Sequence, residues 1–322
     1  MNSTQWIARF ALMLVASVMS GSLSAQGGHV RIVYTFGAGG SGDVTGRIIA
    51  EHMQKTLGTP VIMENKVGAS GRIAIDAVKS APPDGHTLLL AYMGTMVILP
   101  HTTENVRFDS FKDFEPVAHI ADSPLALTVA STAQARDVRE YVDQVKSGRT
   151  PGFFGVAPLG GLPHFLGLQF AATNGIALTV VGYKGGAQMV QAVMAGEVPA
   201  TYSTPADLVP LHKAGKVRIL AVSAPNRMSL LPDVPTFKEA GFDVQASTWL
   251  GLFAPKGTPA AAVNRLSAAV AAALKDSVIA RRLSDMGMEP TGHGPGTLGE
   301  AMRRDFDRWG PVIKTSGYRL KD

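Results

Sequence analysis

The sequence has no cysteine among its 322 residues. This absence excludes disulfide bonds and a cysteine nucleophile, so a stable fold has to come from a large apolar core. Runs of Lys or Arg are also missing. A net charge of +5 is spread along the chain, which argues against nucleic-acid binding and still allows a positively charged pocket for acidic ligands. Hydrophobic residues make up 46% of the chain, enough for one large domain or two.

Motifs that mark catalytic sites are absent as well. The chain has neither a G-x-S-x-G elbow nor an H-E-x-x-H zinc motif. Its eight histidines are scattered, and none is paired at metal-ligand spacing. We therefore predict a protein that is not an enzyme, with no catalytic residues, no metal and no cofactor.

Residues 1–25 have the pattern of a cleavable secretory signal. Arg9 precedes an apolar core, Phe10–Met19, which is too short to span a bilayer. Small residues follow it, and cleavage after Ala25 fits best, although Leu23 stands where a small residue is usual. An uncleaved anchor is the alternative. Export without disulfides favours a bacterial periplasmic protein.

The stretch Arg31–Asp43 organises the chain. An apolar β-branched run meets the glycines of Gly37–Gly42, and a helical pattern follows, so a strand, a tight turn and a helix start are expected. Backbone N–H groups and the helix dipole there suit an anion. The stretch also satisfies the dinucleotide fingerprint G-x-G-x-x-G, with Glu64 after the next strand. Asp43, which would repel a pyrophosphate, and the export signal count against a dinucleotide. Asp43 could equally be an N-cap or face a ligand.

Apolar runs alternate with helical patterns along the remaining chain. Predicted strands are Arg31–Thr35, Pro60–Glu64, His86–Ala91, Phe114–Ala121, Leu125–Ala130, Gly152–Val156, Leu178–Val181, Ala200–Ser203, Ile219–Ser223 and Trp249–Ala254. Predicted helices are Val44–Leu57, Ile73–Ser80, Val138–Lys146, His164–Thr173, Ala187–Met194, Leu208–Ala214, Phe237–Ala240, Ala260–Leu274, Val278–Met286 and Leu298–Ser316. The opening β-α-β-α-β order predicts a parallel sheet. The C-terminal block is expected to be all helical and to pack back on that first sheet.

Loops rich in glycine and small polar residues follow several of these strands. They are Phe36–Asp43, Tyr92–Thr95, Ala157–His164, Tyr183–Gly186 and Ser203–Asp207. Ligands of open α/β sheets bind outside the carboxyl ends of the strands. Two domains that face each other through such loops would form a cleft that holds a carboxylate without any arginine.

Several segments together resemble one known family. They are FGAGGSGDVTGRIIAEHMQKTLGTPVIMENKVGASGRIA, PPDGHTLLLAYMGT, VGYKGGAQMVQAVMAGEV, LHKAGKVRILAVSAPNRMSLLPDVPTFKEAG and WLGLFAPKGTP. In order and spacing they resemble the periplasmic receptors of tripartite tricarboxylate transporters, also called Bug proteins. The resemblance covers nearly all of the mature chain.

The resemblance implies an α/β fold of the periplasmic binding protein type II kind, with two mixed, mostly parallel sheets flanked by helices and a hinged ligand cleft. It implies a signal peptide at 1–25, a discontinuous first domain of 26–124 plus 249–322, and a second domain of 125–248. The implied partners are a small organic carboxylate and the membrane subunits of a transporter, and we expect a monomer. An exported oxidoreductase and a ligand-presenting sensor are the alternatives.

The resemblance also implies the binding residues. They are Phe36, Gly39, Gly40, Asp43, Gly94, Thr95, Gly160, His164, Tyr183, Lys184, Gly185 and Asp207. The first loop would hold the proximal carboxylate, partly through water, and Asp207 matches a position that contacts amino groups in some relatives. His164, Lys184 and Tyr183 could instead be a helix-start residue, a solvated charge and a packing ring.

Two departures from the family pattern bear on the ligand. Thr35 and Gly37 stand where proline is usual, so the first loop is expected to be more flexible. The loop Ala157–Pro163 is apolar where the family usually carries Ser and Asn. Leu159 and Leu162 favour an aromatic or otherwise hydrophobic carboxylate over a strongly hydrated acid such as citrate.

Overall fold

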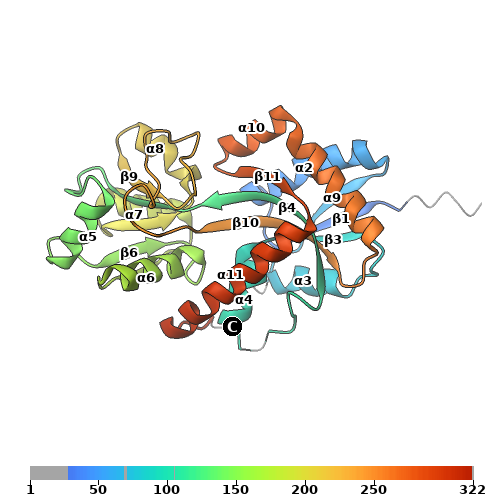
Figure 1. Ribbon diagram of the computed structural model, residues 1–322, viewed down its shortest axis with the longest axis horizontal. Coiled ribbons are helices and arrows are strands. Elements are labelled where there is room, and N and C mark those ends of the chain that lie inside the picture. The colour runs from blue at the N-terminus through green and yellow to red at the C-terminus, as the bar shows by residue number, and fades with distance from the viewer. Residues whose placement is uncertain (1–27, 69–70, 105, 321–322) are drawn as a thin grey trace, which may run out of the picture.

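A computed structural model describes residues 28–68, 71–104 and 106–320 of the chain. The predicted signal, residues 1–25, lies outside the described residues. The described chain forms two lobes, each built around one β-sheet with helices on its faces (Figure 1). The expected two-domain architecture with two mixed sheets is therefore found.

The first lobe contains a six-stranded sheet of order β11-β4-β10-β3-β1-β2. Its strands are β1 (Val30–Tyr34), β2 (Val61–Asn65), β3 (Thr87–Tyr92), β4 (Phe114–Pro124), β10 (Ser247–Pro255) and β11 (Glu289–His293). Its helices are α2 (Ser41–Leu57), α3 (Arg72–Lys79), the π-helix η2 (Gly94–Ile98), α4 (Leu99–Thr102), α9 (Ala260–Lys275), α10 (Ser277–Asp285) and α11 (Pro295–Ser316). As predicted from the β-α-β-α-β order, β1 pairs in parallel with both β2 and β3.

The second lobe contains a five-stranded sheet of order β7-β6-β8-β5-β9. Its strands are β5 (Ala126–Ala130), β6 (Phe153–Val156), β7 (Thr179–Gly182), β8 (Ala200–Ser203) and β9 (Val217–Val222). Its helices are α5 (Val138–Lys146), α6 (Leu162–Asn174), α7 (Gly186–Ala195), the 3-10 helix η3 (Pro205–Asp207) and α8 (Val209–Lys213). The chain enters this lobe between β4 and β5 and leaves it before β10, and Figure 1 shows β4 and β10 running side by side between the lobes.

Packing follows the spacing of the apolar residues. In α2, Gly46, Ile49, Ala50 and Met53 are buried at intervals of three and four, so one face of the helix packs on the sheet. Gly58 ends α2 in the left-handed conformation. Helices α2 and α9 cover one face of the first sheet, and α3 and α11 cover the other.

The structure corrects several details of the prediction. Tyr92–Thr95 is not a loop, because the chain turns into η2 directly after β3. Phe237–Ala240 forms a turn rather than a helix. The C-terminal block is not all helical, since β11 pairs antiparallel with β4. The sheets are not mostly parallel as expected, because β4, β10 and β11 pair antiparallel at one side of the first sheet and β5 pairs antiparallel with β8 and β9 in the second.

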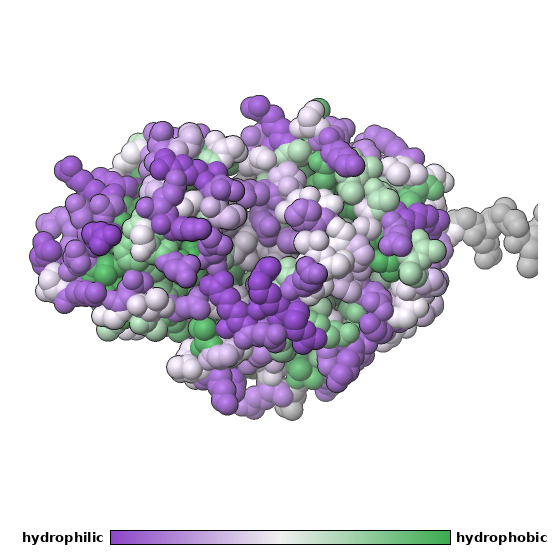
Figure 2. Space-filling model, viewed as in Figure 1, coloured by the Kyte–Doolittle hydropathy of each residue, from purple (hydrophilic) through white to green (hydrophobic). Residues whose placement is uncertain are grey.

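Helix α11 packs against both lobes. Its buried residues Trp309 and Ile313 share one apolar cluster with Phe165 of the second lobe. Arg308 donates a hydrogen bond of 2.8 Å to the side chain of Gln169 in α6. Figure 2 shows hydrophilic side chains gathered over its exposed face. The C-terminal block therefore packs on the first sheet, as predicted, and on the second lobe as well.

Candidate functional site

A cavity of about 290 Å³ lies between the two lobes. Tyr92 at the end of β3, Ala157 after β6 and Thr204 after β8 line it, so it opens at the carboxyl ends of strands from both sheets. Its hydroxyl-bearing residues are Ser41, Tyr92, Ser123, Thr204 and Thr248. Its apolar residues are Leu125, Ala157, Pro158, Leu162, Pro163, Ala206, Met286 and Met288, and three glycines complete it: Gly94, Gly161 and Gly287.

The polarity of this cavity comes from hydroxyl groups and helix ends. None of the described residues that line it carries an ionised side chain at neutral pH. Helix α2 begins at Ser41 after the N-cap Gly40, and α6 begins at Leu162 after the N-cap Gly161, and neither N-cap residue has a side chain to cap the helix. The first turn of α2 can therefore offer several backbone N–H groups to an anion, whereas α6 offers the N–H of Leu162 and its positive dipole end, because Pro163 has no N–H and His164 donates to Gly161.

Asp43, in the first turn of α2, is hydrogen-bonded to the loop Phe36–Asp43 through the Gly39 amide. Its buried carboxylate accepts a 3.0 Å hydrogen bond from the Gly39 amide, two from Arg47 and one of 2.8 Å from Asn65. The hydrogen bonds from Arg47, followed by those from Gly39 and Asn65, lower the pKa of Asp43 to about 2. Asp43 is thus neither a helix N-cap nor exposed to the cavity, and the Gly39 amide is already used. Its charge is compensated, which removes the expected repulsion of a pyrophosphate.

An aromatic group stands at the cavity mouth. The Tyr92 hydroxyl lies 3.1 Å from the Ser41 hydroxyl and is also hydrogen-bonded to Tyr34. The ring of Phe36 packs at 5.7 Å from Tyr34 and 6.3 Å from Tyr92, and its side chain is exposed. Burial raises the pKa of Tyr92, so its phenol stays protonated and available as a donor.

Apart from Asp207, whose side chain is not described, the second-lobe residues predicted to bind ligand do not line the cavity. His164 is buried between the ring of Phe165, at 4.7 Å, and that of Tyr318, at 5.2 Å. Burial lowers the pKa of His164 to about 4, so it is neutral. Gly160 adopts φ +82°, and a Cβ there would lie 2.6 Å from Tyr318.

Of the other residues predicted to bind ligand, one lines the cavity and the rest of those with a described side chain do not. Gly94 lines the cavity, whereas Thr95 is buried behind it and Gly40 lies in the exposed loop before α2. Tyr183 is half-buried, and Lys184 and Gly185 are exposed on the loop before α7. The side chain of Asp207, at the end of η3, lies outside the described part of the structure.

Other lining residues were not predicted from the sequence. Ser41, Tyr92 and Thr204 belong to predicted loops, and their hydroxyl groups were the signal that could have singled them out. Ser123 and Thr248 lie in β4 and β10, where the chain crosses between the lobes. The two expected crossings between domains were the signal that could have identified them. Met286–Met288 follows a helix of the C-terminal block, and no sequence pattern marked it.

Larger hollows among the described residues lie elsewhere, and each is lined by residues of a single lobe. A groove of about 830 Å³ lies between α4 and α11, away from the strand ends. Within the described ranges, His, Asp and Glu form no group suited to a metal ion. A search of the same ranges for helices long and apolar enough to cross a membrane finds none.

Comparison with known proteins decides the family. Residues 45–318 match the sequence model described as the tripartite tricarboxylate transporter family receptor, TctC. The chain belongs to this family. The TctC match covers the whole second sheet, every strand of the first sheet except β1, and all the cavity-lining residues except Ser41.

Similar proteins support the same assignment. Protein BugT of Bordetella pertussis is 27% identical over 326 residues, covering 100% of each chain. The structure of MatC from Rhodopseudomonas palustris with bound malate is 33% identical, with a TM-score of 0.73, covering 88% of this chain and 98% of that one. Rpa4515 of R. palustris with adipate is 31% identical, with a TM-score of 0.77, covering 91% and 98%. MatC and Rpa4515 share the fold over most of this chain.

Proposed function

We propose that this TctC-family protein is a periplasmic receptor that captures a small carboxylate with an aromatic or otherwise apolar body. The cavity between the lobes carries the proposal. Two glycine-capped helix N-termini and five hydroxyl side chains supply hydrogen-bond donors for a carboxylate. Leu125, Leu162 and the two methionines offer apolar surface for the rest of the ligand.

Relatives support the carboxylate part of this proposal. The structures of MatC and Rpa4515 contain malate and adipate, which are both dicarboxylates. Among the described residues that line the cavity, none has an ionised side chain that could pair with a second carboxylate. Burying that group without a partner would be costly, so the cavity favours a monocarboxylate.

Capture is proposed to occur by closure of two domains, 26–124 with 249–322 against 125–248. The exposed loops at Phe36 and at Lys184–Gly185 lie outside the cavity as it stands, and closure would bring them over the ligand. The loaded receptor would then deliver its ligand to the membrane subunits of a tripartite tricarboxylate-type transporter. An N-terminal signal would export it to the periplasm.

Thermal-shift measurements on the purified mature protein test the ligand class. Benzoate and phenylacetate at about 100 times their dissociation constant should stabilise the protein by about 2.7 kcal/mol, a shift of roughly 5 °C. Citrate and glutamate are tested as strongly hydrated comparison ligands. Stabilisation by citrate or amino acids alone would contradict the proposal.

NAD belongs in the same panel because the glycine loop matches the dinucleotide fingerprint. Glu64, which would hold the ribose of a dinucleotide, is instead paired with Arg31 at 3.5 Å and Lys66 at 2.7 Å. We expect NAD to leave the melting temperature unchanged. A clear shift with NAD would favour the oxidoreductase alternative.

A further inference from the structure

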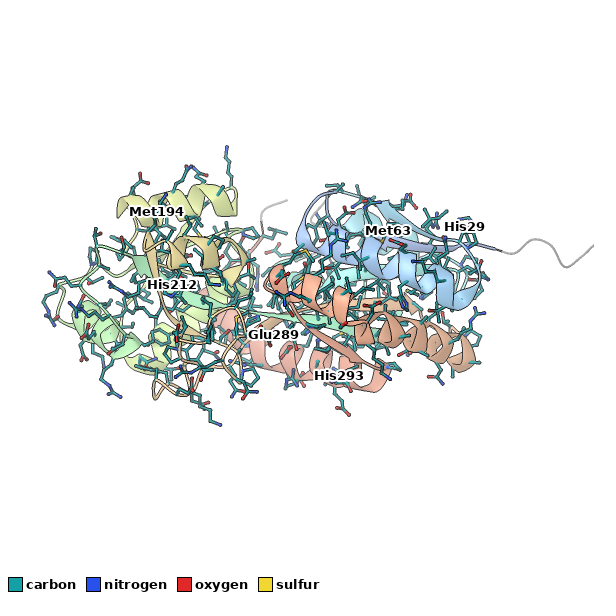
Figure 3. All side chains as sticks on the ribbon, turned by 90° about the horizontal axis from the view of Figure 1, so that it is seen from above. His29, Met63, Met194, His212, Glu289 and His293 are labelled. Atoms are coloured by element: carbon teal, nitrogen blue, oxygen red, sulfur yellow. The ribbon has the colours of Figure 1, made fainter. Side chains whose placement is uncertain are left out.

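The turn between α10 and β11, Met286–Gly287–Met288, is fixed firmly to the first lobe. The backbone N–H groups of Met286 and Met288 both donate to the carbonyl of Leu283, which is fully buried. The sulfur of Met288 accepts a 3.4 Å hydrogen bond from Thr45 in α2. In Figure 3, Glu289, the residue after the turn, lies where the two lobes adjoin. The turn is therefore a rigid projection at the lobe boundary.

This turn touches the second lobe directly. A Cβ added to Gly287 would lie 3.1 Å from the Cα, Cβ and backbone N of Ala206 in η3. Gly287 is buried and adopts φ +73°, a conformation that side chains disfavour. Both the backbone angle and the closeness of the opposite lobe thus favour glycine here.

The same contact forms one wall of the cavity. All three residues of the turn line it, together with Thr204 and Ala206 across the lobe boundary. Thioether side chains are polarisable and pack well against aromatic rings. A carboxylate placed against this wall would lose its hydration without gaining a cation.

We propose that the Met286–Gly287–Met288 turn determines ligand specificity. Its contact with Ala206 sets the gap between the lobes, and its thioethers accept an apolar ligand end and reject a second carboxylate. The inference rests on the proposed capture of a carboxylate at the helix N-termini. Beyond that function, the inference assigns the selection among carboxylates to the Met286–Gly287–Met288 turn.

Gly287→Ala tests the contact with Ala206. The matched control is Gly196→Ala, because Gly196 also has φ +73° but a Cβ there meets nothing within 4 Å. Both variants should lose similar stability from the strained backbone. Calorimetry with benzoate should show at least a ten-fold weaker affinity for Gly287→Ala and a change below two-fold for Gly196→Ala.

Met286→Lys tests the chemistry of the wall. Met286 is only partly buried, so this variant should fold, which circular dichroism checks. An ammonium group at this wall should raise the affinity for adipate relative to benzoate at least ten-fold.

The outcomes separate the two proposals. If benzoate and adipate both fail to bind the wild-type protein, the proposed function is wrong and the specificity element falls with it. If the wild type binds but the two glycine variants behave alike and Met286→Lys leaves the adipate-to-benzoate ratio unchanged, only the role of the turn is overturned.

Discussion

His164 lies in a buried environment that its position in the sequence does not indicate. The sequence places it at the start of a helix beside a glycine-rich loop, where family resemblance makes it a binding residue. In the structure its ring stacks on Phe165 and meets Tyr318 edge-on. The preceding residues Leu162 and Pro163 line the cavity. His164 itself contributes to the packing between α6 and the C-terminal segment.

His164 should make the protein sensitive to acid. Its pKa falls from the usual 6.5 to about 4 on folding, because burial disfavours the charged ring. Between these values the unfolded chain binds a proton that the folded chain does not. The free energy of unfolding should therefore decrease as pH falls from 6.5 to 4, by up to about 3 kcal/mol.

His164→Phe should remove most of this pH dependence and leave benzoate affinity within two-fold of wild type. Melting temperatures measured at steps between pH 7 and pH 4 check the first part, and calorimetry at pH 7 checks the second. A large loss of affinity at pH 7 would instead place His164 in the binding site.

At the level of elements, the junction of β1 and α2 explains why glycines are concentrated there. Gly42 lies in the first turn of α2, and a Cβ on it would come within 2.9 Å of the Tyr92 ring and would also clash with the Tyr34 hydroxyl. The helix can approach the two phenols only because this position has no side chain. The Tyr92 hydroxyl is thereby brought to Ser41 at the cavity.

Gly42→Ala should weaken benzoate binding at least ten-fold and lower the melting temperature. Alanine normally favours a helix over glycine by about 1 kcal/mol, so a loss of stability would point to the steric clash. Gly37→Ala is the control in the loop that precedes α2, since a Cβ there meets nothing within 4 Å. Equal behaviour of the two variants would contradict this explanation.

Element positions could largely be predicted, because apolar periodicity and glycine or proline punctuation act locally. Val138–Lys146 and Ala200–Ser203 agree with the prediction to the residue. Strand β11 was missed because it is short, contains proline and glycine, and exists through its pairing with β4. The ion pair of Asp43 with Arg47 could have been predicted, because the two residues are four positions apart on a helix. The hydrogen bond from Asn65 to Asp43 depends on the parallel pairing of β1 with β2, which is a long-range contact.

For the whole molecule, the cavity is a product of tertiary structure. Family resemblance and the strand-end loops predict a site between two sheets, and a cavity lies there. They could not supply Met286–Met288, because that turn reaches the cavity from the far end of the chain. The contact of α11 with α6 likewise depends on long-range packing, seen in the hydrogen bond between Arg308 and Gln169.

Closure of the lobes is a prediction at this scale. Small-angle X-ray scattering should show a smaller radius of gyration for the wild-type protein with saturating benzoate than without it. Gly287→Ala should show less compaction at the same degree of saturation, because the added methyl group meets Ala206. An unchanged radius for the saturated wild type would argue against a hinged capture mechanism.

The most direct test of the account is a crystal structure of the protein with the carboxylate that stabilises it most. We predict that the carboxylate group lies at the N-termini of α2 and α6, near Ser41 and Tyr92, with its apolar body against Met286 and Met288. A ligand found in the groove between α4 and α11, or one whose charged group faces the methionines, would contradict the proposed site.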